Sequence, residues 1–94
     1  AFQPHTYTRT KALFDEFVKA LALCDQAVLA PIYAAREQAT IGISSDDLAR
    51  AIPGAGSLGS FEEIADYLRR EAGEGDLILT MGAGDIYKVG KMLV

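Results

Sequence analysis

The sequence has few of the residues that build disulfide, metal or membrane-spanning sites. Its 94 residues include one cysteine, one histidine and no tryptophan. A single cysteine excludes an internal disulfide, and one cysteine with one histidine cannot supply the usual ligands of a zinc site. No apolar run approaches the roughly 20 residues that a membrane-spanning helix needs. We therefore expect no disulfide, no metal site and no transmembrane segment.

Positive charge is also scarce. Nine lysine and arginine residues stand against 13 aspartate and glutamate residues, which gives a net charge of −4. Proteins that bind nucleic acid or a membrane surface need a basic face, so we expect neither partner. Hydrophobic residues make up 50% of the chain, enough for a packed core. Because domains typically run to roughly 100–150 residues, we expect residues 1–94 to form one domain, beginning in the tail of a strand at Ala1 and Phe2.

Apolar residues at helical spacing predict the first helix. They are Leu13, Phe14, Phe17, Val18, Leu21 and Cys24. Cys24 is expected to pack there as a small buried hydrophobe. Thr8 or Thr10 is the expected N-cap. Either cap would place Arg9 and Lys11 in the first turn, where the helix dipole disfavours cations. A bound anion would explain these charges, and the alternative is a frayed helix start with solvated side chains.

Further segments alternate between strand and helix patterns. The expected strands are 27–30, a brief one within 53–60, and 76–81, and the expected helices are 44–52, 60–73 and 86–93. Ser44 or Ser45 caps the first of these helices, and Ser60 forms a capping box with Glu63 in the next. Gly73 is expected to close that helix in a left-handed conformation. Strands that alternate with helices predict parallel pairing, with helices on both faces of the sheet.

Polar residues follow the predicted strand 27–30. Tyr33, Arg36 and Glu37 are site candidates, because open α/β sheets bind ligands at the carboxyl ends of parallel strands. His5 is a candidate for the same reason, since it precedes Arg9 by one helical turn at the end of the N-terminal strand. The alternatives are an ordinary polar surface loop and a histidine that only packs or forms a structural hydrogen bond.

A glycine loop follows the predicted strand 76–81. Gly82 and Gly84 allow close backbone approach to a ligand such as a phosphate. A dinucleotide fingerprint would need a third glycine where Tyr87 stands, and the sequence contains no P-loop. Asp85 could accept a hydrogen bond from an ammonium group; alternatively, it is the N-cap of the last helix.

Two stretches resemble a known family. Phe2-Gln3-Pro4-His5 followed by Tyr7-Thr8-Arg9-Thr10, together with the closing Asp76–Ile86, resemble the C-terminal domain of the UDP-N-acetylmuramate–L-alanine ligase family, within the Mur ligase superfamily. The resemblance covers essentially the whole chain. It implies a Rossmann-like three-layer α/β fold with a mostly parallel sheet. The family's Asp-Asp-Tyr-x-His-His-Pro segment is absent, so we expect the domain's first strand and helix to be missing.

The resemblance also implies a function. Members of the family are cytoplasmic enzymes of peptidoglycan precursor synthesis that use ATP and Mg²⁺ to form an acyl phosphate on UDP-N-acetylmuramate, which the amine of L-alanine attacks. Their N-terminal domain holds the UDP group and their central domain carries the P-loop. The C-terminal domain closes the site and brings the amino acid. We therefore expect the 94 residues alone to be inactive, and we assign no catalytic residue within them.

The matching positions suggest roles for individual residues. The resemblance implies that His5 and Arg9 line the site for alanine and the acyl phosphate, and we add Tyr33 and Asp85 as substrate-binding residues. Gly82 and Gly84 form the loop expected beside the phosphate. Thr6 replaces an arginine of many family members, and Pro31 replaces a frequent acidic residue. The rival hypotheses are a non-catalytic, flavodoxin-like ligand or interaction module, and another Mur-type ligase.

Overall fold

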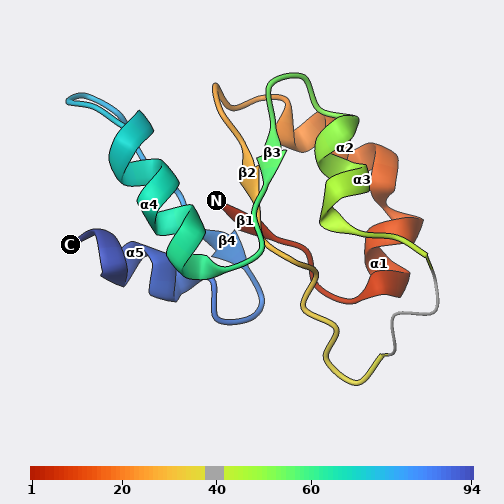
Figure 1. Cartoon of the computed structure of the whole chain (residues 1–94). Coiled ribbons are helices and arrows are strands. Elements are labelled where there is room, and N and C mark those ends of the chain that lie inside the picture. Colours follow the sequence, from red (N-terminus) through yellow and green to blue (C-terminus); the bar gives the residue numbers. More distant parts are fainter. Residues whose placement is uncertain (38–41) are drawn as a thin grey trace.

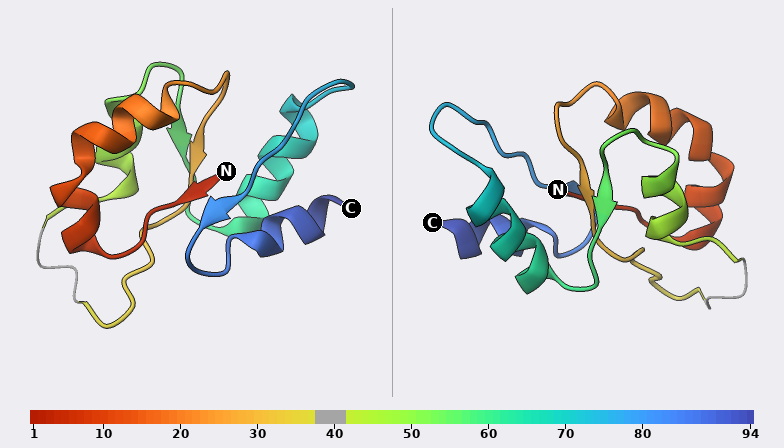
Figure 2. Two further views of the ribbon diagram at one scale, coloured as in Figure 1. Left: turned by 180° about the vertical axis from the view of Figure 1, so that it is seen from behind. Right: turned by 45° about the horizontal axis from the view of Figure 1, so that its top comes forward.

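The computed structural model describes residues 1–37 and 42–94 as a three-layer α/β fold. Four parallel strands form the central sheet in the order β3-β2-β1-β4. They are β1 (Phe2–Gln3), β2 (Val28–Leu29), β3 (Gly56–Ser57) and β4 (Met81–Gly82). Figures 1 and 2 show three helices on one side of the sheet, namely α1 (Tyr7–Ala12), α2 (Phe14–Leu21) and α3 (Ser45–Arg50), and two on the other, namely α4 (Phe61–Glu71) and α5 (Tyr87–Leu93). The predicted fold class is confirmed.

Strand β2 and the residue after it supply both cores of the molecule. Successive side chains of a strand point to opposite faces of its sheet. Val28 and Ala30 accordingly join one buried cluster, together with Ile64, Ala65, Ile86 and Val89 of the α4–α5 side. Leu29 joins the other, together with Leu21, Leu48, Ala49 and Ile52 of the α2–α3 side. The apolar run in the sequence is thus a central strand buried on both faces.

The first predicted helix is two helices, which meet at Leu13. The N-cap is Thr6, whose hydroxyl accepts a hydrogen bond from the Arg9 N–H at 3.2 Å, so the expected cap at Thr8 or Thr10 was wrong. Because α1 is short and begins at Tyr7, Arg9 and Lys11 lie in its last turn. Cations are favoured at that end of a helix. The charge pattern of α1 is therefore ordinary.

Cys24 is exposed, which contradicts its predicted burial. Helix α2 ends at Leu21, so the helical spacing that placed Cys24 on the apolar face no longer applies to it. Its thiol donates to the Leu21 carbonyl at 3.0 Å.

Helices α3 and α4 begin where the sequence predicts. Ser44 and Asp47 form a complete capping box at α3. At α4, Ser60 accepts a hydrogen bond from the Glu63 N–H at 3.2 Å, but the Glu63 carboxylate accepts from the Gly59 N–H at 3.3 Å instead of from the cap residue. The predicted box at α4 is thus only half formed.

The end of α4 differs from the prediction. The helix ends at Glu71, with Ala72 as an extended C-cap. The left-handed glycine is Gly75, with φ of 89°, and Gly73 is not in that region. Gly73 instead donates its N–H to the Asp76 carboxylate at 2.7 Å, which closes a turn after the helix.

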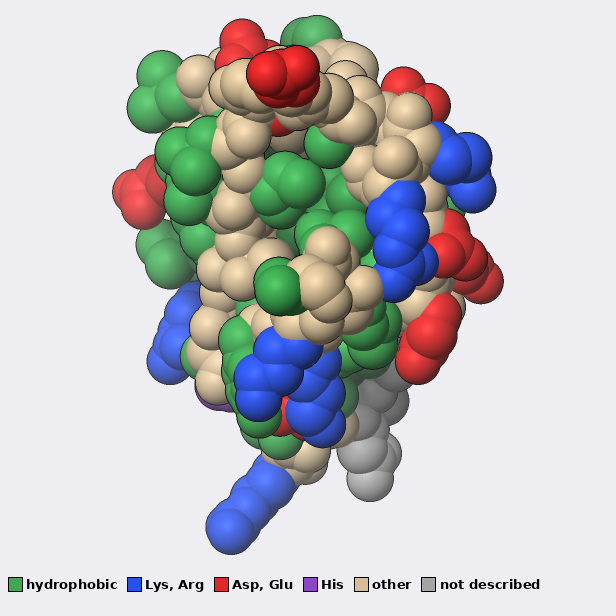
Figure 3. Space-filling view, turned by 90° about the vertical axis from the view of Figure 1, so that its left-hand side faces the viewer, with side chains coloured by type: hydrophobic (Ala, Val, Ile, Leu, Met, Phe, Trp, Pro, Cys, Tyr) green, Lys and Arg blue, Asp and Glu red, His purple; other side chains and the backbone are tan. Residues whose placement is uncertain are grey.

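The predicted strand 76–81 is a paired strand only at its end. Met81 and Gly82 pair with Phe2 and Gln3 of β1, whereas the described residues place no strand beside residues 76–78. Leu77 is 84% exposed. Figure 3 shows this face, where hydrophobic side chains gather in the upper half around a hollow. An apolar run predicts where a strand can form, but its hydrogen bonds require a neighbour.

Within residues 1–37 and 42–94, every helix is too short or too polar to cross a bilayer.

Replacing a buried leucine by alanine should be far more costly than replacing an exposed one. Leu48 is fully buried in the α2–α3 core, and Leu23 is 88% exposed. We expect Leu48→Ala to lower the free energy of unfolding by about 2–5 kcal/mol and Leu23→Ala to change it by less than about 0.5 kcal/mol. Urea unfolding of both variants measures the difference, and equal losses would contradict the assigned core.

Candidate functional site

The candidate site is built where the chain leaves β1 and β2. His5 and Tyr33 form an isolated parallel bridge beyond the two strands. The Tyr33 N–H donates to the Pro4 carbonyl at 2.8 Å, and the Thr6 N–H donates to the Tyr33 carbonyl at 2.7 Å. The His5 and Tyr33 rings stack, with centroids 5.4 Å apart and planes 14° apart. Two residues that the sequence placed at separate strand ends thus lie against each other.

Arg9 reaches back to this pair. Its Nη1 lies 3.3 Å from Nδ1 of His5. A guanidinium only donates hydrogen bonds, so His5 accepts at Nδ1 and carries its proton on Nε2. Arg9 is exposed, and its guanidinium forms no salt bridge with a carboxylate of residues 1–37 or 42–94. The site therefore presents an oriented cation to solvent.

The chain's own Glu37 binds the first turn of α1. Its Oε1 accepts hydrogen bonds from the N–H groups of Tyr7, at 2.6 Å, and Thr8, at 3.0 Å, while Oε2 accepts from the Thr8 hydroxyl. The hydroxyl and N–H of Thr8 are the largest causes that hold the pKa of Glu37 below its usual value. The backbone groups expected to bind an external anion are thus taken by Glu37, and only the Arg9 side chain remains for a ligand.

The glycine loop lies beside the ring pair. A Cβ on Gly84 would lie 3.1 Å from Cδ2 of Tyr33 and 3.1 Å from Oε1 of Gln3. A Cβ on Gly82 would lie 2.9 Å from Cγ2 of Ile86. Both glycines are therefore required for close packing against the chain itself, which brings the loop to the site. Their presence does not by itself indicate a phosphate.

Gln3 is a site residue that the sequence reasoning missed. It is only 7% exposed, and its Nε2 donates to the Pro31 carbonyl at 3.2 Å. Its Oε1 is buried without a hydrogen-bond partner among the described residues. A polar residue inside a predicted strand end was the available signal, since buried polar groups usually have partners.

Asp85 and Arg36 lie at the margin of the site. Helix α5 begins at Tyr87, with Ile86 as N-cap and no side-chain cap, so the alternative role of Asp85 as a cap was wrong. The carboxylate of Asp85 is exposed and 3.5 Å from the Lys88 ammonium. Arg36 is exposed, and no hydrogen bond or ion pair joins it to the described part of the chain.

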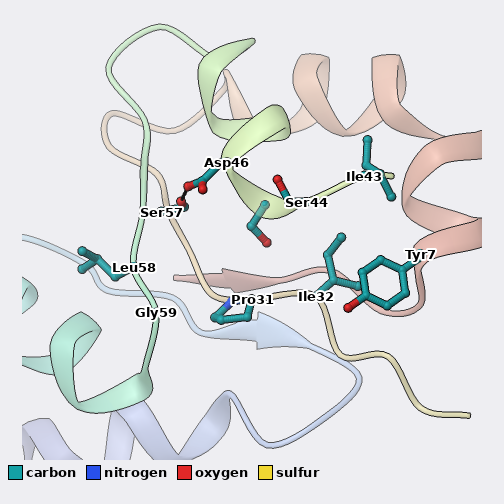
Figure 4. Close-up of a pocket in the computed structure, with 10 residues that line it drawn as sticks. Tyr7, Pro31, Ile32, Ile43, Ser44, Asp46, Ser57, Leu58 and Gly59 are labelled. Atoms are coloured by element: carbon teal, nitrogen blue, oxygen red, sulfur yellow. Dashed lines mark hydrogen bonds between the residues drawn. The ribbon is translucent and has the colours of Figure 1, made fainter. Parts of the chain in front are cut away.

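A separate cavity of about 480 Å³ lies at the carboxyl ends of β2 and β3. It contains none of the predicted site residues. Figure 4 shows Asp46 and Ser57 facing each other across it, and the Ser57 hydroxyl donates to the Asp46 carboxylate. The hydroxyl of Ser45 donates to the Ala30 carbonyl. These polar groups are satisfied within the chain, so the cavity indicates no particular ligand.

Comparison with known proteins separates the candidate chemistries. The chain is 56% identical, over 97 aligned residues, to UDP-N-acetylmuramate–L-alanine ligase of Lachnospira eligens. It is 53% identical to the ligase of the same name from Acetivibrio thermocellus and 52% identical to that of Clostridium botulinum strain Langeland. The chain is homologous to one part of these ligases. Each match covers 99% of the chain but 21% of the relative, which is consistent with a C-terminal domain. No protein-family model matches the chain.

The Glu37 contacts should make stability depend on pH. The pKa of Glu37 is lowered in the folded protein, so the unfolded state binds its proton first as the pH falls. The stabilisation is complete above the usual pKa of 4.5 and is lost as the pH falls through the lower folded value. We expect Glu37→Gln to be less stable than the wild type at about pH 7 and the two to converge between about pH 5 and pH 3.

Chemical unfolding across this pH range measures the effect. Glu74→Gln is the matched control, because Glu74 is exposed in the turn after α4. The control should run parallel to the wild type. Parallel curves for Glu37→Gln would show that the carboxylate contacts contribute nothing to stability.

Proposed function

We propose that the chain is the amino-acid-binding, C-terminal domain of a cytoplasmic, ATP-dependent ligase that joins L-alanine to UDP-N-acetylmuramate in peptidoglycan precursor synthesis. The names of the homologous ligases support this substrate pair. The observation that carries the proposal is the Arg9 guanidinium, held at the carboxyl end of the sheet by His5. Among the described residues it has no carboxylate partner.

Arg9 would bind the carboxylate of L-alanine. A guanidinium and a carboxylate form charge-assisted, often bidentate hydrogen bonds, which orient the amino acid as well as hold it. His5 limits the movement of Arg9, and the stacking of Tyr33 limits that of His5. The Nε2–H of His5 is a second donor for an oxygen of the reacting groups.

The glycine loop would supply the other half of amino-acid recognition. Asp85 is the proposed acceptor for the substrate ammonium, with Lys88 as its present neighbour. We also propose that Gly82 and Gly84 bring the backbone of the loop close to the phosphate of the reaction. The packing of Gly84 on Tyr33 supports this placement, because it couples the loop to the His5–Arg9 site.

The described residues do not fit a site for ATP and Mg²⁺. The sequence has no P-loop, and the space beside both loop glycines is filled by the chain's own atoms. No group of three metal-binding side chains occurs in residues 1–37 and 42–94. We therefore assign both cofactors, and the UDP group, to the N-terminal and central domains of a longer ligase.

The 94-residue chain alone should not catalyse ligation. Incubation with ATP, Mg²⁺, L-alanine and UDP-N-acetylmuramate should give no product by mass spectrometry, while one of the homologous full-length ligases serves as the positive control. Product that depends on both ATP and the chain would overturn the division of labour proposed above.

In a full-length ligase that contains this domain, Arg9→Ala should raise the KM for L-alanine about tenfold to hundredfold. A hydrogen bond to a charged group contributes roughly 1.5–3 kcal/mol. The KM for ATP should change little, because Arg9 is assigned to the amino acid. Steady-state kinetics with each substrate varied in turn separates the two constants.

Arg70→Ala is the matched control, since Arg70 is exposed on α4, on the opposite side of the sheet. It should leave both constants unchanged. An unchanged alanine dependence in Arg9→Ala would return Arg9 to the status of a surface residue.

A further inference from the structure

Thr6 has a backbone conformation that its residue type disfavours. Its φ is 62° and its ψ is 146°. A positive φ brings the Cβ of an L-residue against the backbone, and a β-branched residue there is a genuine outlier. The strain is specific to this helix start. Ser44 and Ser60 cap α3 and α4 with φ of −140° and −149°, in the ordinary extended region.

Hydrogen bonds on every polar group of Thr6 maintain this conformation. Its N–H donates to the Tyr33 carbonyl at 2.7 Å, and its hydroxyl accepts from the Arg9 N–H at 3.2 Å. Its carbonyl accepts from the N–H of Thr10 at 3.2 Å and from the Thr10 hydroxyl at 2.7 Å. Thr10 is fully buried. The surrounding structure therefore over-determines the conformation, as strained residues require.

The strained residue connects the two parts of the candidate site. On one side of Thr6, His5 is fixed to Tyr33 by the bridge and the ring stack. On the other side, α1 begins at once, and Arg9 returns to within 3.3 Å of His5. An extended cap, as at α3 and α4, would satisfy the helix start equally well. The unusual conformation therefore serves the direction in which α1 leaves the strand.

We propose that Thr6 is a positioning residue of the amino-acid site. Its strained backbone sets the angle between β1 and α1, so that the guanidinium of Arg9 and the imidazole of His5 meet. This inference rests on the proposed function, because it assigns the strain to the binding of L-alanine. Thr6 itself need not touch the substrate.

Three substitutions separate strain, cap and position. Thr6→Gly and Thr6→Ala both remove the capping hydroxyl, and only alanine retains a Cβ at the positive φ. Thr6→Ser retains the hydroxyl without the β-branch. The thermal midpoint is measured on the 94-residue chain. The KM for L-alanine is measured in the full-length ligase, beside Arg9→Ala.

We expect the two measurements to rank glycine and alanine in opposite orders. Thr6→Gly should melt about 4–8 °C above Thr6→Ala, because it relieves the steric strain. It should nevertheless have a KM for L-alanine about tenfold above the wild type, because the angle is no longer held. Thr6→Ala should stay within about threefold of the wild-type KM and Thr6→Ser within about twofold.

Two results would overturn the inference. If Thr6→Gly melts below Thr6→Ala, the conformation stores no strain. If Thr6→Gly and Thr6→Ala have the same KM, the strain does not position the site. The proposed function fails separately: Arg9→Ala would then leave the KM for L-alanine unchanged, whatever the Thr6 variants show.

Discussion

Backbone hydrogen bonds join the β1 and β2 segments from within the sheet to the candidate site. The Ala30 N–H donates to the Phe2 carbonyl at 2.9 Å, and the Tyr33 N–H donates to the Pro4 carbonyl at 2.8 Å. The Thr6 N–H then donates to the Tyr33 carbonyl at 2.7 Å. The same pairing that buries Val28 and Leu29 in the two cores therefore sets Tyr33 against His5. The fold and the site depend on one ladder.

Irregular features gather at the end of this ladder. The strained Thr6 lies there, as does the unpaired Oε1 of Gln3, and Ala35 has a positive φ of 57° without being a glycine. The ends of α3 and α4 away from the site have ordinary serine caps. Strain that concentrates in one place is typical of functional sites, where the surrounding structure holds residues in disfavoured conformations. The distribution of these features supports the same location as the homologous ligases suggest.

Charge around α1 is arranged in two layers. Glu37 neutralises the N–H groups of the first turn, and Arg9 lies in the last turn with its side chain turned back to His5. A helix with both ends satisfied in this way does not need a ligand to be stable. The cation of Arg9 can therefore be used for binding without becoming a condition for folding.

The prediction of the fold succeeded where local pattern and pairing agree. The apolar run 27–30 became a strand buried on both faces, and the serine caps of α3 and α4 lie at the predicted positions. It failed where local pattern was the only guide. The run 76–81 pairs only at Met81, and the helical spacing that included Cys24 continues beyond the end of α2.

The sequence by itself determined the alternation of strands and helices, the α/β class and the family resemblance that the homologous ligases confirm. It also determined which segments carry candidate residues, because parallel strands direct their following loops to one edge of the sheet. Only the tertiary structure decided what those residues do to one another. Glu37 lies 29 positions from Thr8 in the chain, yet its carboxylate replaces the expected anion. Contacts between distant segments depend on the packing of the whole domain, which local residue patterns do not encode.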